Sequence, residues 1–199
     1  MLSHFIGSRR KQAGRVDLPI LAIVGIITVL GGAAIALTYT PSKARANLLV
    51  GNATTLAAAV KVMIADTGCI PIHPNALWDK TQVATASNLF CNQTVSNSWS
   101  GPYVEASPIN AAGDITFNKI ADASVMTINR VAATNNFNWI YYVQVSDVDN
   151  DTIQAAMQQC TGATTNTAGG AIPAQLQTTP CGYATGSTNT FYRLITMTQ

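Results

Sequence analysis

The sequence predicts an α+β protein in which a long N-terminal helix packs on an antiparallel β-sheet and disulfides staple the C-terminal region. Three observations predict this class. An uncharged apolar run at residues 18–37 is followed by an amphipathic helical pattern at residues 42–66, and then by short segments rich in β-branched and aromatic residues. No helix-length crossover separates most of these segments, so the strands are expected to be antiparallel.

The first element is the apolar run, LPILAIVGIITVLGGAAIAL, which has twenty residues and no charge. A helix of this length spans roughly 30 Å, the hydrocarbon thickness of a bilayer. Four basic residues lie just before it: Arg9, Arg10, Lys11 and Arg15. Positive charge marks the cytoplasmic end of a membrane span. We therefore expect the N-terminus in the cytoplasm and the chain after residue 37 to be exported.

The second element is the helix expected at residues 42–66, after a kink or short break at Pro41. Its apolar residues recur every three or four positions, as one buried helix face requires. They are Leu49, Ala53, Leu56, Val60 and Met63. The opposite face carries Asn52, Thr55 and Lys61, and Gly68 is a natural stop. The two segments together form a nearly continuous helix, half in lipid and half amphipathic.

The remaining elements are shorter. In chain order we expect a loop at 67–102 with a short helix near 80–90, strands at 103–106, 114–120, 124–130 and 139–145, a capped helix at 147–160, a loop at 161–190 and a final strand in FYRLITM. The segment WIYYVQV is the strongest strand candidate because it is rich in aromatic and β-branched residues.

The charge distribution limits the possible partners. Charged residues make up 10% of the chain, and the net charge is +2. Three of the eleven basic residues lie within residues 1–14, which leaves eight basic against nine acidic residues. Nucleic-acid binding needs clustered Lys and Arg, so no nucleic-acid partner is expected. A surface built on Asn, Thr, Ser and Gln suits a secreted or assembled protein.

The cysteines are expected to form structural disulfides. They are Cys69, Cys91, Cys160 and Cys181. All four fall on the exported side, where disulfides persist. Sequential pairing, first with second and third with fourth, closes two short loops and is favoured among the three possible pairings. A metal site is disfavoured because there is no CxxC motif, and His4 and His73 lie far apart.

Catalysis is not expected. His73 is the one histidine on the exported side and lies in a Pro-rich loop, while Glu105 is the one glutamate of the chain. A Ser-His-Asp triad or a pair of catalytic carboxylates is therefore disfavoured in the expected head. We expect no enzyme activity, no cofactor and no metal.

A calcium loop is the competing interpretation of Asp147, Asp149 and Asp151, which alternate as its ligands do. Its sixth position is Thr152 rather than Gly, and its twelfth is Gln158 rather than Glu. Helix capping is therefore the favoured interpretation.

Several features in order resemble the type IV pilins, in particular the type IVb group. A short basic leader ends at Gly14, and the apolar segment begins within four residues and passes into an amphipathic helix. GCIP at 68–71 stands where these pilins leave the helix, and WSGPY at 99–103 is similar to the sequence before their sheet. Cys160 and Cys181 match the cysteine pair of the pilin C-terminal region. The resemblance covers essentially the whole chain.

The resemblance implies a leader at residues 1–14, a long helix at 15–66 and an exported head at 67–199. It implies cleavage between Gly14 and Arg15 by a prepilin peptidase. Pro19 then stands where the family has a glutamate, and Asp17 is the nearest acid. Asp17 either substitutes in setting the register of assembly, or the chain is a minor or divergent pilin, or it escapes cleavage.

The resemblance implies a filament subunit, held in the inner membrane with a periplasmic head and then assembled into an extracellular helical homopolymer for adhesion, conjugation or motility. Its partners would be copies of itself and the pilus assembly machinery. Gly25, Gly31 and Gly32 would permit close helix packing or local loosening of the helix outside lipid. The alternatives are a minor pilin or type II secretion pseudopilin and, from another class, a membrane-anchored periplasmic binding module.

Overall fold

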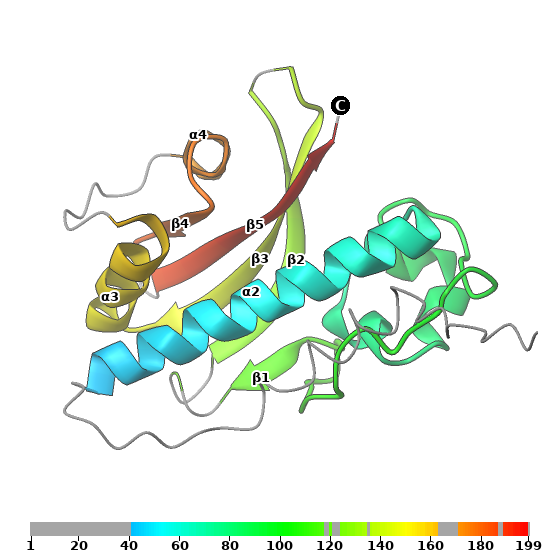
Figure 1. The fold of residues 1–199 in the computed structure, drawn as a ribbon, viewed down its shortest axis with the longest axis horizontal. Coiled ribbons are helices and arrows are strands. Elements are labelled where there is room, and N and C mark those ends of the chain that lie inside the picture. The colour runs from blue at the N-terminus through cyan, green and yellow to red at the C-terminus, as the bar shows by residue number, and fades with distance from the viewer. Residues whose placement is uncertain are drawn as a thin grey trace, which may run out of the picture.

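The structure is a computed structural model, and it describes residues 41–117, 120, 124–134, 136–162, 171–186 and 189–198 (Figure 1). Its helices are α2 (Pro41–Thr67), α3 (Asn150–Thr161) and α4 (Ile172–Leu176), with 3-10 helices η1 (Pro74–Leu77), η2 (Gln82–Ala84) and η3 (Ala86–Asn88). Its strands are β1 (Ile115–Phe117), β2 (Ser124–Ala132), β3 (Trp139–Val148), β4 (Cys181–Ala184) and β5 (Asn189–Thr198).

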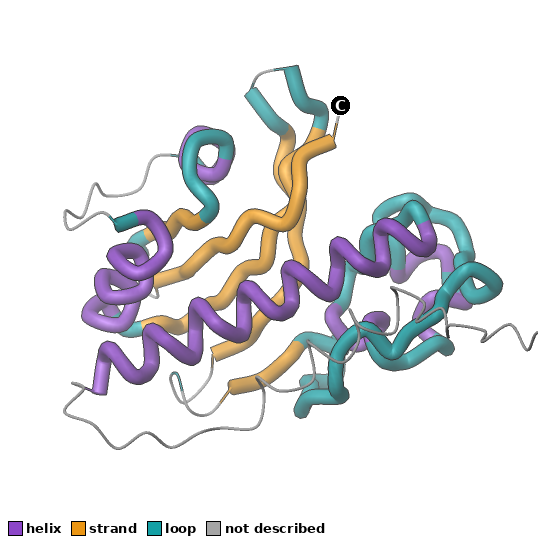
Figure 2. Tube along the Cα trace, in the orientation of Figure 1, coloured by secondary structure: helices purple, strands orange, loops and turns teal. Residues whose placement is uncertain are grey.

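The described residues form an α+β fold built on one antiparallel sheet. Its five strands lie in the order β1-β2-β3-β5-β4, and every neighbouring pair is antiparallel. The helix α2 crosses one face of this sheet (Figure 1), and the strands run behind it in Figure 2. The predicted fold class and antiparallel sheet are therefore confirmed for this part of the chain.

The predicted apolar stripe of α2 forms the centre of the core. Its five residues, Leu49, Ala53, Leu56, Val60 and Met63, are at most 2% exposed. They pack in one cluster with residues of the sheet and of α3. The helix ends at Thr67. Gly68 follows with a positive φ of 73°, which suits glycine, and its N–H donates to the carbonyl of Ile64 at 2.8 Å.

The sheet buries side chains on both faces because strand residues alternate between them. On β3, Tyr141, Val143 and Val145 belong to the large cluster under α2 and α3. Ile140 and Tyr142 belong to a second, smaller cluster that includes Leu176 of α4. Helix α4 therefore covers the face of the sheet opposite α2.

Three sequence-based expectations for the first half of the head are wrong in detail. The strand expected at 103–106 is absent, because Tyr103 donates its N–H to the carbonyl of Leu77 in a loop. The strand expected at 114–120 is described only as Ile115–Phe117. The helix expected near 80–90 is two 3-10 helices. There the Asp79 carboxylate accepts from the Thr81 N–H at 2.9 Å, a local bond that competes with a regular helix.

The loop expected at 161–190 is also wrong in part, because it contains α4 and β4. Pro173 stands in the first turn of α4, where proline's fixed φ suits a helix start. The expected strands β2 and β3, the helix α3 and the last strand β5 are present with boundaries close to those predicted.

Candidate functional site

The residues that the sequence assigns to processing and assembly lie outside the described residues. They are Gly14, Arg15, Asp17, Pro19, Gly25, Gly31 and Gly32, together with the predicted span at 18–37. The candidate site within the described chain is therefore the surface of α2, the helix that follows this segment, and the two loops that disulfides close.

The side of α2 that faces away from the sheet carries an uncharged stripe of mostly small and apolar residues. We call it the outward stripe, and it consists of Ala44, Leu48, Gly51, Thr55, Ala58, Val62 and Ala65. These positions recur at intervals of three and four residues, which places them on one helix face. Leu48 is 42% exposed and Val62 is 39% exposed, so two large apolar side chains of the stripe face solvent.

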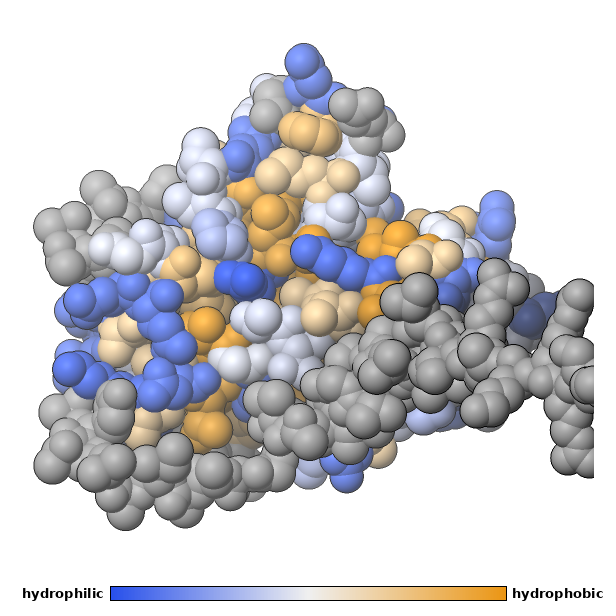
Figure 3. Space-filling view, in the orientation of Figure 1, coloured by the Kyte–Doolittle hydropathy of each residue, from blue (hydrophilic) through white to orange (hydrophobic). Residues whose placement is uncertain are grey.

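The outward stripe differs from the face expected from the sequence. Thr55 lies in the stripe, Lys61 is exposed beside it, and Asn52 is half-buried. Figure 3 views the α2 side of the molecule: hydrophilic residues gather over the α3 end, while the middle mixes apolar, weakly polar and hydrophilic residues. The polar residues of α2 therefore border a surface on which another apolar helix could pack.

Nothing in the described structure requires a glycine at residue 51. A Cβ at this position would meet nothing within 4 Å. Glycine inside a helix destabilises it by roughly 0.5–1 kcal/mol relative to alanine. Small residues on a helix surface let a second helix approach closely. The described structure therefore has room for a side chain at residue 51.

Of the helices that the structure describes, α2 is long and apolar enough to cross a membrane by length and composition. Within its most apolar stretch, 44% of the residues are buried inside the protein, and they pack on α3 and the sheet. The core helix of a soluble protein can have the same length and apolar composition as a membrane span. The helix therefore combines a buried face with an exposed uncharged one.

The first disulfide joins Cys69 to Cys91 and closes a loop of 3-10 helices, which we call loop 1. Two backbone hydrogen bonds of 2.9 Å lie beside it, from the Ile72 N–H to the Asn88 carbonyl and from the Phe90 N–H to the Ile70 carbonyl. Loop 1 carries buried side chains of the main core, among them Leu77, Val83 and Leu89.

The second disulfide joins Cys160, in the last turn of α3, to Cys181, the first residue of β4. We call the segment between them loop 2. The sequential pairing that the sequence favours is therefore confirmed for both disulfides. The Arg193 guanidinium lies against this second disulfide, with Nη1 at 2.8 Å from Cys160 Sγ and 3.2 Å from Cys181 Sγ.

The outer edge of β4 is covered by a side chain rather than by a strand. The Gln175 side chain donates from Nε2 to the Tyr183 carbonyl and accepts at Oε1 from the Tyr183 N–H, both at 2.9 Å. A Cβ at residue 182 would stand 2.7 Å from Gln175 Oε1, so Gly182 makes room for this amide. Gln175 thus satisfies the backbone groups that an edge strand would otherwise expose.

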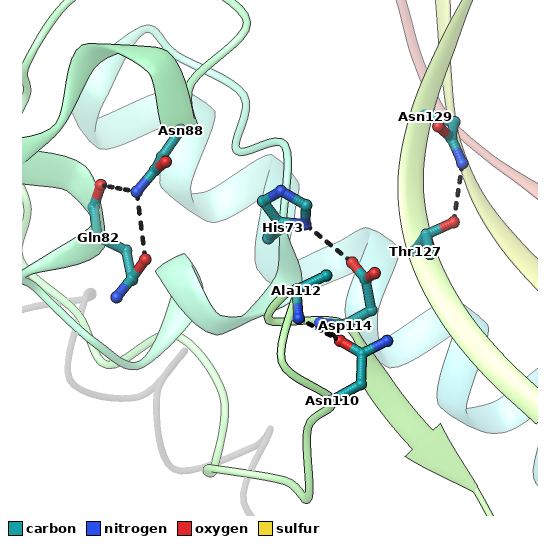
Figure 4. A network of polar contacts seen from close by, with 8 residues as sticks. All are labelled: His73, Gln82, Asn88, Asn110, Ala112, Asp114, Thr127 and Asn129. Atoms are coloured by element: carbon teal, nitrogen blue, oxygen red, sulfur yellow. Dashed lines mark hydrogen bonds and ion pairs between the residues drawn. The ribbon is translucent and has the colours of Figure 1, made fainter.

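Loop 1 is fastened to the start of β1 by polar contacts (Figure 4). His73 Nδ1 lies 2.9 Å from Asp114 Oδ1, and the Asp114 carboxyl is largely buried. The Asn75 N–H donates to the Gly113 carbonyl at 3.3 Å, and the Asn75 side chain lies where a Cβ of Gly113 would be. The sequence did not predict the contact between His73 and Asp114, because these two residues are 41 positions apart and no local pattern links them.

Asp149 acts as the helix cap that the sequence favours over a calcium ligand. Its carboxylate accepts from the Thr152 N–H at 2.8 Å and from the Thr152 hydroxyl at 2.7 Å, at the start of α3. Burial raises the pKa of Asp149, but the bonds from Thr152 and the nearby Arg45 outweigh it, so the net pKa is lowered. Within the described ranges, no three potential ligand side chains gather as a metal site would require.

Three contacts were missed by the sequence analysis: His73 with Asp114, Gln175 with Tyr183, and Arg193 with the second disulfide. Each joins residues brought together only by the tertiary fold, so hydrophobic periodicity carries no signal for them. Comparison with known proteins found no matching family model, no matching curated protein and no matching solved structure.

Proposed function

We propose that this protein is a structural subunit of a type IV pilus of the type IVb kind. In this proposal, helices of neighbouring subunits pack together through the outward stripe of α2 and the apolar segment that precedes it. The outward stripe carries the proposal: it is uncharged, includes exposed Leu48 and Val62, and stands on the helix that follows the apolar sequence at residues 18–37.

One apolar helix surface suits two environments, the lipid bilayer and the interior of a filament. An apolar helix that is stable in lipid is also stable against other apolar helices, because both remove it from water. Full burial of a wholly exposed Leu or Val side chain contributes about 1.5–3 kcal/mol, so covering the exposed part of Leu48 or Val62 contributes about 1 kcal/mol. In a repeated contact between subunits, burial of Leu48 and Val62 therefore stabilises the interface. Gly51 and the alanines of the stripe allow the helices to approach closely.

The head has the features of an exported domain. Both of its disulfides fit an oxidising compartment. Under this proposal the subunit waits in the inner membrane with its head in the periplasm. A prepilin peptidase cleaves between Gly14 and Arg15, and the assembly machinery then moves the subunit into an extracellular homopolymer.

The stripe is tested by adding bulk at Gly51. In cells with the assembly machinery, we expect Gly51→Leu to remain in the membrane but to be lost from sheared surface fibres, since leucine separates the helices. Gly51→Ala is the milder variant, and Gln158→Leu, on the exposed side of α3, adds an apolar side chain away from the stripe. Normal fibres from Gly51→Leu, with the Gln158→Leu control intact, would contradict the proposed packing.

The second test is N-terminal sequencing of the mature protein. Arg15 as the first residue is expected, and an intact Met1 would rule out processing. Fibres in which the protein is only a trace component would instead favour a minor pilin or pseudopilin. Protein found in membranes and never in fibres would favour the anchored periplasmic binding module.

A further inference from the structure

We propose that the Cys160–Cys181 disulfide is a thiol–disulfide exchange site for a dithiol protein or small dithiol, and that Arg193 stabilises the departing Cys181 thiolate. The Cys69–Cys91 disulfide lacks this feature and serves as the inert reference. This inference concerns the chemistry of the head and does not depend on filament assembly.

The position of Arg193 follows from the sheet. Residue 193 on β5 is the direct cross-strand partner of Cys181 on β4, so both side chains project from the same face. Cys160 reaches this point from the last turn of α3. The result is one guanidinium nitrogen, Nη1, within hydrogen-bond distance of both sulfur atoms.

The charge of Arg193 lacks a carboxylate partner in the described part of the chain, where the ion pairs are Arg45 with Asp149 and His73 with Asp114. Burial lowers the pKa of Arg193. A neutral disulfide sulfur is only a weak acceptor, whereas a thiolate carries a full negative charge. Opening the disulfide therefore gives this guanidinium the anion that it lacks.

Access to the two sulfurs decides the direction of attack. Cys160 is partly exposed, while Cys181 is 0% exposed. The incoming thiolate therefore bonds to Cys160 Sγ, the bond between the two cysteines breaks, and its electron pair passes to Cys181 Sγ beside Arg193.

The second thiol of the dithiol completes the exchange. It loses its proton to solvent and displaces Cys160, which leaves as a thiolate and takes up a proton from solvent. The external dithiol is oxidised to a disulfide by two electrons, and the protein disulfide is reduced by the same two electrons.

The first disulfide is a close internal control. It also has one nearly buried sulfur residue, Cys69, and one partly exposed residue, Cys91. In the described structure no cationic side chain donates a hydrogen bond to either of its sulfurs. The two bonds thus match in exposure, and a difference in reactivity that disappears when Arg193 is replaced reports the cation.

The experiment is timed reduction of the full-length protein in detergent with dithiothreitol, followed by acid quench, alkylation and mass spectrometry of each cysteine pair. We expect the Cys160–Cys181 bond to open about tenfold faster than the Cys69–Cys91 bond. Arg193→Met should remove this advantage, and Arg193→Lys should keep most of it. The Cys69–Cys91 rate reports that each variant remains folded.

A second measurement needs no variant. In the reduced wild-type protein, the alkylation rate of Cys181 against pH should show a thiolate that forms below the ordinary thiol pKa of about 8.5. Burial in apolar surroundings raises the pKa of a thiol, so a purely structural arginine would leave that profile at or above the ordinary value. The proposal is overturned by an ordinary Cys181 profile, or by equal opening rates of the two disulfides in the wild-type protein.

Discussion

Loop 1 and loop 2 are closed by disulfides of almost the same sequence separation, 22 and 21 residues, yet their surroundings differ. Loop 1 is filled by side chains of the main core and fastened by backbone bonds beside its disulfide. Loop 2 crosses from α3 to the edge strand β4 and contributes Leu176 to a small cluster, and its disulfide lies against the Arg193 guanidinium of β5.

Covalent and non-covalent stabilisation can be told apart in these two loops. Because loop-closure entropy depends on loop length, the two disulfides restrict the unfolded chain by nearly the same amount. Any difference between the loops in stability or reactivity must therefore come from burial, hydrogen bonding and charge. Loop 1 is part of the core, whereas loop 2 is an attachment at the edge of the sheet.

The largest effect should come from truncating a buried leucine in each loop. Leu77 of loop 1 and Leu176 of loop 2 are both 0% exposed. Leu→Ala substitutions of this kind cost about 2–5 kcal/mol of unfolding free energy. We expect Leu77→Ala near the top of that range, because its cavity lies in the large core. Leu176→Ala should lie near the bottom, because the five-residue α4 can settle into the space.

Urea unfolding of the full chain in detergent, followed by near-ultraviolet circular dichroism, measures both variants. Leu48→Ala, an exposed residue of the outward stripe, is the matched leucine control and should change the unfolding midpoint little. A larger loss from Leu176→Ala than from Leu77→Ala would reverse the assignment of core and attachment.

The second effect is removal of each disulfide as a Cys→Ser pair. We expect each removal to lower the unfolding free energy by about 3 kcal/mol, since the loops are nearly equal in length. The Cys69→Ser/Cys91→Ser protein should keep loop 1 protected from proteolysis, because its backbone bonds and core residues remain. The Cys160→Ser/Cys181→Ser protein should be cut within loop 2 at low protease concentration. Cleavage of loop 1 first would contradict this comparison.

Long periodic elements were predictable from the sequence, and short ones were not. The stripe from Leu49 to Met63 repeats over several turns of α2, and the aromatic and β-branched run WIYYVQV on β3 leaves little choice of structure. Asp149 caps α3 through contacts three residues away, which sequence spacing can reveal. By contrast, β4 has four residues and includes Gly182, so neither periodicity nor propensity marks it.

The candidate site was predictable only in part for the same reason. The buried face of α2 is evident from its large apolar residues, but the outward stripe consists mostly of small residues that resemble a solvated face. Arg193 and the second disulfide meet only because β4 and β5 pair, which no local pattern reports. Contacts that depend on tertiary structure cannot be predicted from local sequence patterns.

The third effect concerns the edge of loop 2. Gln175→Ala leaves the N–H and carbonyl of Tyr183 without their side-chain partner, and a lost bond to a buried backbone group costs about 1–3 kcal/mol. We expect a loss near the lower end, since water reaches the sheet edge, together with faster hydrogen exchange at the Tyr183 amide. Gly182→Ala should have a similar effect, because its Cβ would displace the Gln175 amide.

The matched variant is Gln175→Glu, which keeps an acceptor for the Tyr183 N–H but loses the donor to its carbonyl. Exchange at the Tyr183 amide should then stay slower than in Gln175→Ala. If Gln175→Ala leaves that exchange rate unchanged, the Gln175 side chain does not protect the backbone of the edge strand β4.

The smallest effect is electrostatic and lies at the start of α3, the helix that carries Cys160. Because the pKa of Asp149 is lowered in the folded state, its ionised form contributes stability above the ordinary carboxyl pKa of 3.8. That contribution is lost as pH falls below 3.8 and through the lowered pKa. Asp149→Ala should lower the unfolding free energy by about 1 kcal/mol at neutral pH. The ion pair between Arg45 and Asp149 adds little to the unfolding free energy, since both side chains are exposed.

Asp149→Asn separates the cap from the charge. Asparagine caps helices about as well as aspartate but does not ionise, so this variant should keep most of the stability at neutral pH. Its unfolding free energy should fall less than that of the wild-type protein when pH is lowered below 3.8. An equal fall in both proteins would mean that other carboxylates carry the acid sensitivity, and that α3 is held by its cap alone.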